Sequence, residues 1–311
     1  MDLGKPNLEA FANAVRELAR QDPSVLVVTS DSRGSGKLSP FGKEFPKQII
    51  EVGIAEQNLV GVAAGLASTG KTVFAVSPAC FLTARALEQI KNDVCYSDNP
   101  VKVVGISAGV SYGALGSTHH SLHDYAVLRA INNITVVAPA DNLEATQAVL
   151  AAAKLRSPVY LRFGKKAMPH LPGNPADFEL GKARWIRQGT DLVFVACGET
   201  VVEAFQAAEL LAQDNFSAGV LSVHTIKPFD TQTILDVAGS VRAMITVEEH
   251  SVHGGLGEAC AALLLEHGLA PKFKCVGIPD EYTVTGSQTE IFQYYGISPS
   301  GLAKTARKLL G

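Results

Sequence analysis

The sequence predicts an α/β fold of two consecutive domains, each a mostly parallel β-sheet flanked by helices. Short runs of β-branched residues alternate with helical patterns along the whole chain, as in successive βαβ units. With 311 residues, the chain is long enough for two ordinary domains. A proline-containing stretch without regular hydrophobic spacing separates the two series. We therefore expect a first domain at 1–170, a linker at 171–187 and a second domain at 188–311.

The first domain begins with an amphipathic helix at 8–20, where apolar residues recur every three and four positions. Its strands are short apolar runs typical of buried parallel sheets. We place them at 25–30, 72–78, 101–107, 134–140 and 158–166. A helix is expected at 80–97, and Asp141 with Glu144 resembles a capping box that begins the next helix.

The second domain repeats this alternation, which predicts a second parallel sheet. Its strands are expected at 191–197, 217–223, 242–249 and 272–278. Its helices are expected near 199–213, 230–239, 255–267 and 298–310. Ser298 followed by Pro299 is a favourable N-cap and first-turn pair for the last of these helices.

The composition is that of a soluble globular protein, with 47% hydrophobic and 18% charged residues. The net charge of −3 and the lack of basic clusters argue against binding to nucleic acid or to an anionic membrane. No apolar run reaches the roughly 18 residues of a membrane span, and no secretory signal is visible. The five cysteines show no paired spacing, so we expect reduced thiols and a cytoplasmic protein.

The run EVGIAEQN at 51–58 and the following LVGVAAGLASTG at 59–70 form the most informative stretch. The second run has no charge and many small residues, which predicts a tightly packed, buried helix. Glu56 stands at its start in apolar company, where a carboxylate can share a proton with a bound group. From the residues alone, the alternative is that Glu56 caps the helix or pairs with an arginine.

This stretch resembles the cofactor-glutamate motif in the pyrimidine-binding domain of transketolase and its relatives. Those relatives are 1-deoxyxylulose-5-phosphate synthase and the beta subunits of 2-oxo acid dehydrogenases. In that family the glutamate hydrogen-bonds the aminopyrimidine ring of thiamine diphosphate and promotes loss of the thiazolium C2 proton. The resemblance spans essentially the whole chain, and it implies that Glu56 is a catalytic and cofactor-binding residue.

A glycine-rich loop at 108–124 holds three of the chain's eight histidines within five positions. Imidazoles beside a cofactor can donate to oxygen atoms or move protons at neutral pH. The run Gly116-Ser117-Thr118-His119-His120 resembles the family's G-x-T-H-Q segment. The resemblance makes His119 a catalytic and substrate-binding candidate. His123 is a second substrate-binding candidate, and Asp124 matches less regularly.

The resemblance also implies contacts on two neighbouring segments. Phe81, one helical turn before Arg85, corresponds to a phenylalanine that lies against the aminopyrimidine, and both residues are candidate cofactor contacts. A lone helical phenylalanine is otherwise a core residue. Asp31 and Ser35, in a polar glycine loop after a strand, correspond to cofactor and substrate-phosphate contacts respectively.

The expected strand at 158–166 ends in a basic tip formed by Arg162, Lys165 and Lys166. Such a tip suits a phosphate group, although it is also compatible with a solvated strand end. The resemblance singles out Arg162 as the residue that binds the substrate phosphate.

Two departures from the family pattern concern substrate and assembly. Leu115 stands where many transketolases carry an acidic residue that reads a sugar hydroxyl, so the usual pentose phosphates are in doubt. The chain has Asn132-Asn133 but no G-D-G motif, which in this family holds Mg²⁺ and the diphosphate. We therefore expect no metal ligands here, and an N-terminal transketolase subunit that supplies the Mg²⁺ and diphosphate site, with a heterotetramer as the assembly.

Three other site types fit the sequence less well. Ser107 stands in a G-x-S-x-G run, but a loop follows it where a hydrolase elbow needs a helix. The three histidines and Asp124 could bind a metal, but no matching signature supports this. The run at 255–260 is a weak dinucleotide motif with Cys260 in place of the third glycine. The turn that begins at Glu248-Glu249-His250 resembles a structural, interfacial element of the family.

The resemblance implies the C-terminal subunit of a split transketolase. The predicted function is transfer of a two-carbon ketol unit from a ketose, expected to be phosphorylated, to an aldose. Activity would require the partner subunit. The alternatives are a beta subunit of a 2-oxo acid dehydrogenase, a 1-deoxyxylulose-5-phosphate-synthase-like enzyme, and a non-catalytic partner that stabilises another chain.

Overall fold

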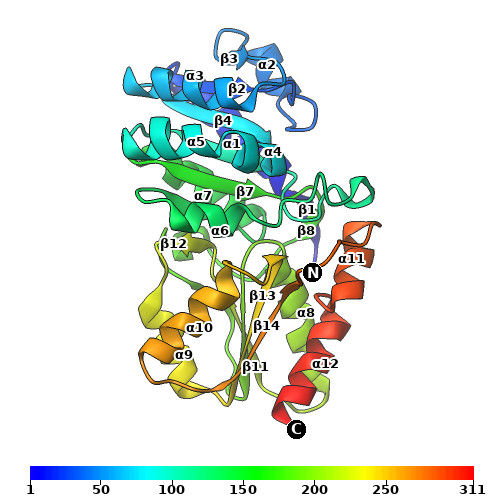
Figure 1. Cartoon of the computed structure of the whole chain (residues 1–311). Helices are drawn as coiled ribbons and strands as arrows, with labels where there is room; N and C mark the ends of the chain where they lie inside the picture. Colours follow the sequence, from blue (N-terminus) through cyan, green and yellow to red (C-terminus); the bar gives the residue numbers. More distant parts are fainter.

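A computed structural model of the chain describes all of residues 1–311 and shows two α/β domains, one above the other (Figure 1). The first domain, blue to green, contains the N-terminus close to the junction. The second domain, yellow-green to red, ends with the C-terminus at the far end of the molecule. The predicted fold class of two consecutive α/β domains is confirmed.

The first sheet has seven strands in the order β12-β6-β7-β5-β4-β2-β3. All neighbours from β6 to β3 are parallel, and only β12 is antiparallel to its neighbour. Since β12 comes from the second half of the chain, the expectation of one sheet per half missed this strand. The bounds are β2 (Val25–Thr29), β3 (Ile49–Glu51), β4 (Thr72–Pro78), β5 (Lys102–Ile106), β6 (Thr135–Val137), β7 (Val159–Phe163) and β12 (Thr225–Lys227).

Helices cover both faces of this sheet, so alternate residues of a strand enter different cores. In β4, Phe74 and Val76 pack in the core beneath α1 and α7, whereas Val73 and Ala75 pack beneath α3, α4 and α6. This two-sided burial explains why the strands are continuous apolar runs. The helix bounds are α1 (Asn7–Gln21), α2 (Ser39–Glu44), α3 (Glu56–Ser68), α4 (Ala79–Arg85), α6 (Asp124–Ala130) and α7 (Asn142–Lys154).

The helix expected at 80–97 is interrupted. The backbone leaves the helical region at Ala86, after which α5 (Leu87–Gln89) leads into a π-helix at Ile90–Tyr96. Neither glycine nor proline marks the break, so composition gave no signal for it. The break ends α4 at Arg85, immediately beside the candidate site.

The second sheet has five strands in the order β14-β13-β10-β11-β9, parallel except for β9. Because β9 belongs to this sheet, the last residues of the segment predicted as a linker are part of the second domain. The four strands predicted for this domain are present. The bounds are β9 (Arg184–Arg187), β10 (Leu192–Ala196), β11 (Ala218–Ser222), β13 (Ala243–Ser251) and β14 (Lys272–Ile278).

Helices α8, α11 and α12 share one core of the second domain, and α9 and α10 lie on the other face of its sheet. Ser298 accepts a hydrogen bond from the Gly301 amide and caps α12, as predicted. A small sheet of β1 (Leu3–Pro6) and β8 (Ala167–Pro169) lies near the junction. The helix bounds are α8 (Thr200–Gln213), α9 (Thr231–Ser240), α10 (Leu256–Glu266), α11 (Gln288–Tyr295) and α12 (Pro299–Leu310).

The two domains share hydrophobic core. Leu59 of α3 and Leu128 of α6 belong to the same buried cluster as Leu256 and Cys260 of α10. All five cysteines are free, and four of them are buried. None of the helices combines the length and the apolar character needed to span a bilayer.

Candidate active site

The candidate site residues of the first domain collect at one edge of its sheet. Because the strands from β6 to β3 are parallel, their carboxyl ends face the same side, where ligands bind in open α/β sheets. The side chains that follow these ends are Asp31 and Ser35 after β2, Glu56 after β3, Phe81 and Arg85 after β4, His119 after β5 and Lys165 after β7.

Glu56 is the first residue of α3, and only 3% of it is exposed. Gly53, with φ of 74°, allows the chain to turn from β3 towards this helix. The helix N-terminus favours a negative charge at this position. The Nη1 atom of Arg85 donates hydrogen bonds to both carboxylate oxygens, at 3.0 and 2.9 Å. The pairing with an arginine that the residues alone allowed is therefore present, within the candidate site.

Phe81 lies next to this ion pair. It stands four residues before Arg85 on α4, so the two side chains share one helix face. The guanidinium carbon of Arg85 lies 4.5 Å from the centroid of the Phe81 ring. The Arg85 side chain is 51% exposed, whereas Glu56 beneath it is buried. The arginine thus covers the carboxylate on the solvent side.

His119 continues the row of contacts. Its ring meets Phe81 and Tyr112 edge-on, with centroids 5.2 and 5.4 Å apart. The Thr118 hydroxyl lies 2.9 Å from Nδ1, and Nε2 has no hydrogen-bond partner in the chain. The imidazole is therefore held between two aromatic rings with one nitrogen available to a ligand. Sequence reasoning missed Tyr112, although its place in the same glycine loop was a usable signal.

The other polar residues of this loop point to different places. The ring nitrogens of His120 contact Thr283 and a loop carbonyl, and His123 Nε2 lies 3.1 Å from the Thr83 hydroxyl on α4. Asp124 is completely buried. No three potential metal ligands stand together anywhere in the structure, so the metal-site alternative finds no support.

Arg162 lies in the interior, and this placement contradicts the expectation that it binds a substrate phosphate. It is 5% exposed and donates hydrogen bonds to Asp124 Oδ2 at 2.8 Å and to the carbonyls of Ser121 and Glu249 at 3.2 and 2.8 Å. Burial alone would raise the pKa of Asp124, but the charges of Arg162 and His250, together with the hydrogen bonds from Arg162 and Tyr160, lower that pKa below its usual value. Because β7 is an interior strand of a sheet that is covered on both faces, the Arg162 side chain is buried. Its hydrogen bonds connect the first domain to Glu249 of the second domain.

The solvent-facing cation of the basic tip is Lys165. It is exposed, and its Nζ atom lies 4.7 Å from the centroid of the Tyr112 ring, which in turn contacts His119. Lys166 instead lies 3.3 Å from the Glu203 carboxylate on α8. Of the three basic residues, Lys165 is therefore the one placed beside the row of site contacts.

Asp31 and Ser35 lie at the same sheet edge but belong to a separate set of contacts. The Asp31 amide donates to Glu51 at 2.6 Å, and its side chain is exposed. The Ser35 hydroxyl donates to the Ser32 carbonyl at 3.1 Å. Neither contacts the row that runs from Glu56 to Lys165, and their roles stay predictions.

Two buried carboxylates of the second domain lie behind the histidine loop. Gln288 Nε2 donates to Glu199 at 3.1 Å and to Glu249 at 2.8 Å. Burial, together with the neighbouring Glu249 carboxylate, raises the pKa of Glu199 to about 8. Sequence reasoning identified the turn at Glu249 as interfacial but missed Glu199, the N-cap residue of α8, and Gln288, the first residue of α11.

The chemistry of these side chains fits one half of thiamine diphosphate. A buried carboxylate provides the acceptor that an aminopyrimidine needs, and the partly exposed Phe81 provides a flat apolar face. The diphosphate half needs a divalent cation, and no group of three His, Cys, Asp or Glu side chains that could hold one is found in the structure. The side chains of the row fit the pyrimidine half of the cofactor.

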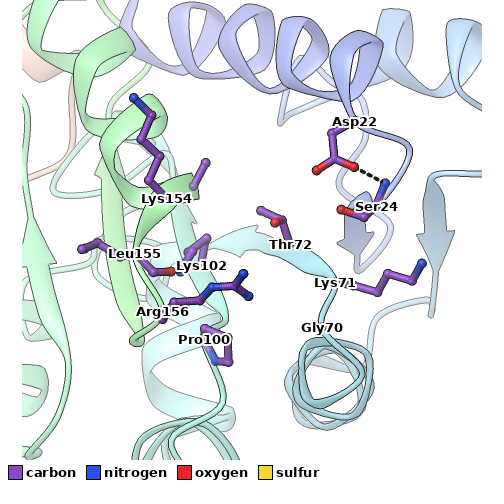
Figure 2. A pocket seen from close by; sticks show the side chains of 11 residues that line it. Asp22, Ser24, Gly70, Lys71, Thr72, Pro100, Lys102, Lys154, Leu155 and Arg156 are labelled. Carbon is purple, nitrogen blue, oxygen red and sulfur yellow. Dashed lines mark hydrogen bonds between the residues drawn. The ribbon is translucent and has the colours of Figure 1, made fainter.

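A basic pocket at the opposite edge of the sheet has a different explanation (Figure 2). It encloses about 300 Å³ at the amino ends of the strands. Lys102 Nζ donates there to the carbonyls of Leu155 and Ser157 at 2.8 and 3.1 Å. Burial lowers the pKa of Lys102 to about 8. Because α1, α3 and α7 end at this edge, its cations complement helix C-termini, and we assign it no ligand. The cations are Lys71, Lys102, Lys154 and Arg156.

Comparison with known proteins agrees with this geometry. The family description "Transketolase, pyrimidine binding domain" matches residues 6–170, and "Transketolase, C-terminal domain" matches residues 181–302. The chain is 47% identical over 300 residues to a subunit of the apulose-4-phosphate transketolase of Phocaeicola vulgatus, covering 96% of this chain and 95% of that protein.

Two further relatives extend this likeness. A 6-deoxy-6-sulfo-D-fructose transketolase subunit of Clostridium sp. is 33% identical over 301 residues, covering 97% of this chain and 93% of that protein. A solved split-gene transketolase, described as an inactive beta4 tetramer, superposes with a TM-score of 0.90 at 34% identity, covering 99% of both chains. With both domains matched and near-complete coverage of relatives, the chain belongs to the transketolase family.

Proposed function

We propose that the chain is the second, C-terminal subunit of a split transketolase, which transfers a two-carbon ketol unit from a phosphorylated ketose to an aldose. The observation that carries the proposal is the row Glu56, Arg85, Phe81, His119 at the carboxyl edge of the first sheet. It combines a buried carboxylate, an aromatic face and an imidazole with a free nitrogen. The relatives named as transketolase subunits support the same reaction type.

Each residue of the row has a distinct task. Glu56 accepts a hydrogen bond from the aminopyrimidine and holds its proton, and Phe81 packs against that ring. Thiamine diphosphate, when bound, supplies the electron sink for cleavage beside a carbonyl. His119 donates from Nε2 to substrate oxygens, because its other nitrogen is occupied by Thr118. Arg85 shields the carboxylate from solvent until the cofactor contacts it.

Three further residues complete the proposed cofactor and substrate contacts. Lys165 takes the place that the sequence interpretation gave to Arg162, as the cation for the substrate phosphate. Asp31 and Ser35 lie at the same edge and would contact cofactor and phosphate respectively. His123 is bound to Thr83 through Nε2, so its role is to hold the histidine loop against α4.

The partner is an N-terminal transketolase subunit that holds Mg²⁺ and the diphosphate. Two observations support this assignment: the chain lacks a G-D-G motif, and it has no cluster of metal ligands. Two relatives are themselves named as single subunits of a transketolase, which implies a second subunit in their own enzymes. We propose a heterotetramer with two copies of each chain, which works in the cytoplasm, where thiols stay reduced.

The donor is proposed to be a phosphorylated ketose other than the common pentose phosphates. Leu115 is 55% exposed at the end of the short 3₁₀ turn Gly113–Leu115, next to the histidine segment. An apolar side chain there cannot accept a hydrogen bond from a sugar hydroxyl. Apulose 4-phosphate, which names two of the relatives, is therefore the first donor to assay.

The test is reconstitution with an N-terminal transketolase subunit, thiamine diphosphate and Mg²⁺. Ketol transfer from apulose 4-phosphate or another ketose phosphate to an aldehyde is the expected result. Decarboxylation of 2-oxo acids without ketol transfer would instead identify a dehydrogenase beta subunit. Formation of a deoxy sugar phosphate from pyruvate would indicate the synthase. Cofactor binding by the pair that is unaffected by Glu56→Ala would indicate a merely stabilising subunit.

A further inference from the structure

The loop between β5 and α6 carries the proposed catalytic histidine, yet most of its anchors belong to the other domain. In Figure 1 this teal loop extends beyond the first sheet and lies above α11 of the second domain. Four of its residues, Ser107, Gly109, Gly113 and Gly116, have positive φ values between 50° and 71°. The backbone hydrogen bonds within the loop close local turns and one bridge between Gly109 and Ser121, so the placement of the loop relative to the sheet depends on external contacts.

The base of the loop is fixed by Glu249 of β13. Its Oε1 atom accepts a hydrogen bond from the Val110 amide at 2.9 Å, and the same oxygen accepts one from Gln288 at 2.8 Å. Glu249 is 2% exposed, so no water competes for these bonds. A Cβ atom on Gly109 would stand 2.1 Å from the Glu249 carboxyl carbon. The close approach of loop and carboxylate therefore requires glycine.

The tip of the loop is fixed by Thr283, which precedes α11. Its hydroxyl lies 2.7 Å from the Ser117 hydroxyl and 3.0 Å from His120 Nδ1. His120 Nε2 lies 2.9 Å from the Gly113 carbonyl, which ties the tip back to the middle of the loop. A Cβ atom on Gly113 would stand 2.4 Å from the Gly286 carbonyl oxygen. The second domain therefore touches the loop backbone directly at this point.

His119 lies between the two residues that Thr283 holds, Ser117 and His120. Its own polar contacts are local, with the amide donating to the Gly116 carbonyl at 2.9 Å and the side chain contacting Thr118. From the first domain, the Phe81 ring contacts the imidazole directly, whereas the other first-domain contacts, such as that of His123 with Thr83, hold the ends of the loop.

We propose that Thr283 and Glu249 are positioning residues through which the second domain sets the place of His119 opposite Glu56. This inference rests on the proposed role of His119. Small misplacements of a group that contacts the substrate lower the rate by up to roughly a hundredfold. The loss of one anchoring hydroxyl is expected to lower kcat by about three- to tenfold, the range that one hydrogen bond of this kind represents.

The experiment compares Thr283→Val with Thr305→Val in the full-length chain reconstituted with its partner subunit. Both threonines are half-buried in the second domain, but Thr305 lies on α12, away from the loop. Thr283→Val is expected to lower kcat about three- to tenfold without changing the KM for the cofactor. It is also expected to speed amide hydrogen exchange across residues 108–123. Thr305→Val should change neither quantity, and Thr283→Ser should restore both.

A double-mutant cycle with His119→Ala separates positioning from general damage. If Thr283 acts through His119, adding Thr283→Val to His119→Ala lowers kcat no further. The inference would be overturned if the losses in kcat from the two substitutions were additive. It would also be overturned if Thr283→Val changed neither kcat nor the amide hydrogen exchange of residues 108–123. A wild-type kcat in His119→Ala would instead overturn the proposed role of His119. The hydrogen-exchange measurement does not depend on activity, so it would then still show whether Thr283 holds the loop. Exchange in Thr283→Val as slow as in the wild type would show that Thr283 does not hold it.

Discussion

Arg85 donates two hydrogen bonds from one nitrogen to the two carboxylate oxygens of Glu56, on the side where that carboxylate approaches solvent. The two side chains come from helices that follow consecutive strands of the chain, α3 after β3 and α4 after β4, and β2 lies between these strands in the sheet. Arg85 also leans on Phe81, so one cation connects the acceptor and the aromatic face. This connection is why we treat the three residues as one site.

Glu56→Gln should lower ketol transfer by roughly 10²- to 10⁴-fold, because the amide cannot hold the aminopyrimidine proton. Stability should change little, since the partner lost is a half-exposed arginine. Turnover of the reconstituted enzyme and thermal unfolding of the chain measure the two effects. Glu88→Gln, at an exposed position on α5, is the matched control. A wild-type rate in Glu56→Gln would remove Glu56 from the mechanism.

The sequence predicted correctly at which edge of the first sheet the candidate residues lie, because the carboxyl ends of parallel strands all face the same edge. Once VLVVT and the later apolar runs are recognised as parallel strands, everything that follows their carboxyl ends must share an edge. The resemblance singled out Glu56, Phe81 and His119, and the order of the strands places all three at this edge, while their roles stay predictions. Capping of α12 by Ser298 is similarly a local property and was predicted correctly.

Arg162 shows where such reasoning stops. Its neighbours in the sequence indicate a strand tip, but whether a strand residue faces solvent depends on what covers the sheet, here the second domain. The same limit applies to β12, which crosses from the second half of the chain into the first sheet. Non-local packing of this kind leaves no periodic signal in the strand itself.

Lys165→Met should raise the KM for a phosphorylated donor roughly tenfold, because it removes one charge-assisted contact to the phosphate. The KM for the same ketose without its phosphate should stay unchanged. Steady-state kinetics with the two donors make the comparison. Lys308→Met, at an exposed position on α12, controls for the loss of a positive charge. Equal effects on both donors would mean that Lys165 does not bind the phosphate.

Arg162→Met should destabilise the chain by about 3–5 kcal/mol, since it leaves the Asp124 carboxylate buried without its cation. The exposed Arg242, 62% accessible and 3.8 Å from Asp191, provides the contrast. Arg242→Met should cost about 0–1 kcal/mol. Urea denaturation of both variants measures the difference. If the two variants unfolded at similar urea concentrations, the buried Arg162 would contribute no more to the free energy of unfolding than the surface Arg242.

The carboxylates of Glu199 and Glu249 meet at the domain junction, with Gln288 donating to both. The charged groups that face Glu199 are Glu249, Arg162 and Lys166. Burial and the Glu249 charge raise the pKa of Glu199 from 4.5 to about 8. Between these values the folded chain holds a proton that the unfolded chain has released, so stability falls as pH rises. His250, whose pKa burial lowers to about 4, acts in the opposite direction below pH 6.5.

Glu199→Gln removes the proton-binding group but keeps a neutral side chain of the same shape beside Gln288. Relative to the wild type, the variant should therefore gain stability as pH rises from about 5 to 8.5, by on the order of 4 kcal/mol. His250 is unchanged in both proteins, so its effect cancels in the difference. Denaturation midpoints across this range test the sign, with Glu209→Gln on the exposed side of α8 as control. A constant difference between Glu199→Gln and wild type at every pH would mean that Glu199 is ionised in the folded chain throughout, and that the junction holds a carboxylate pair without a proton.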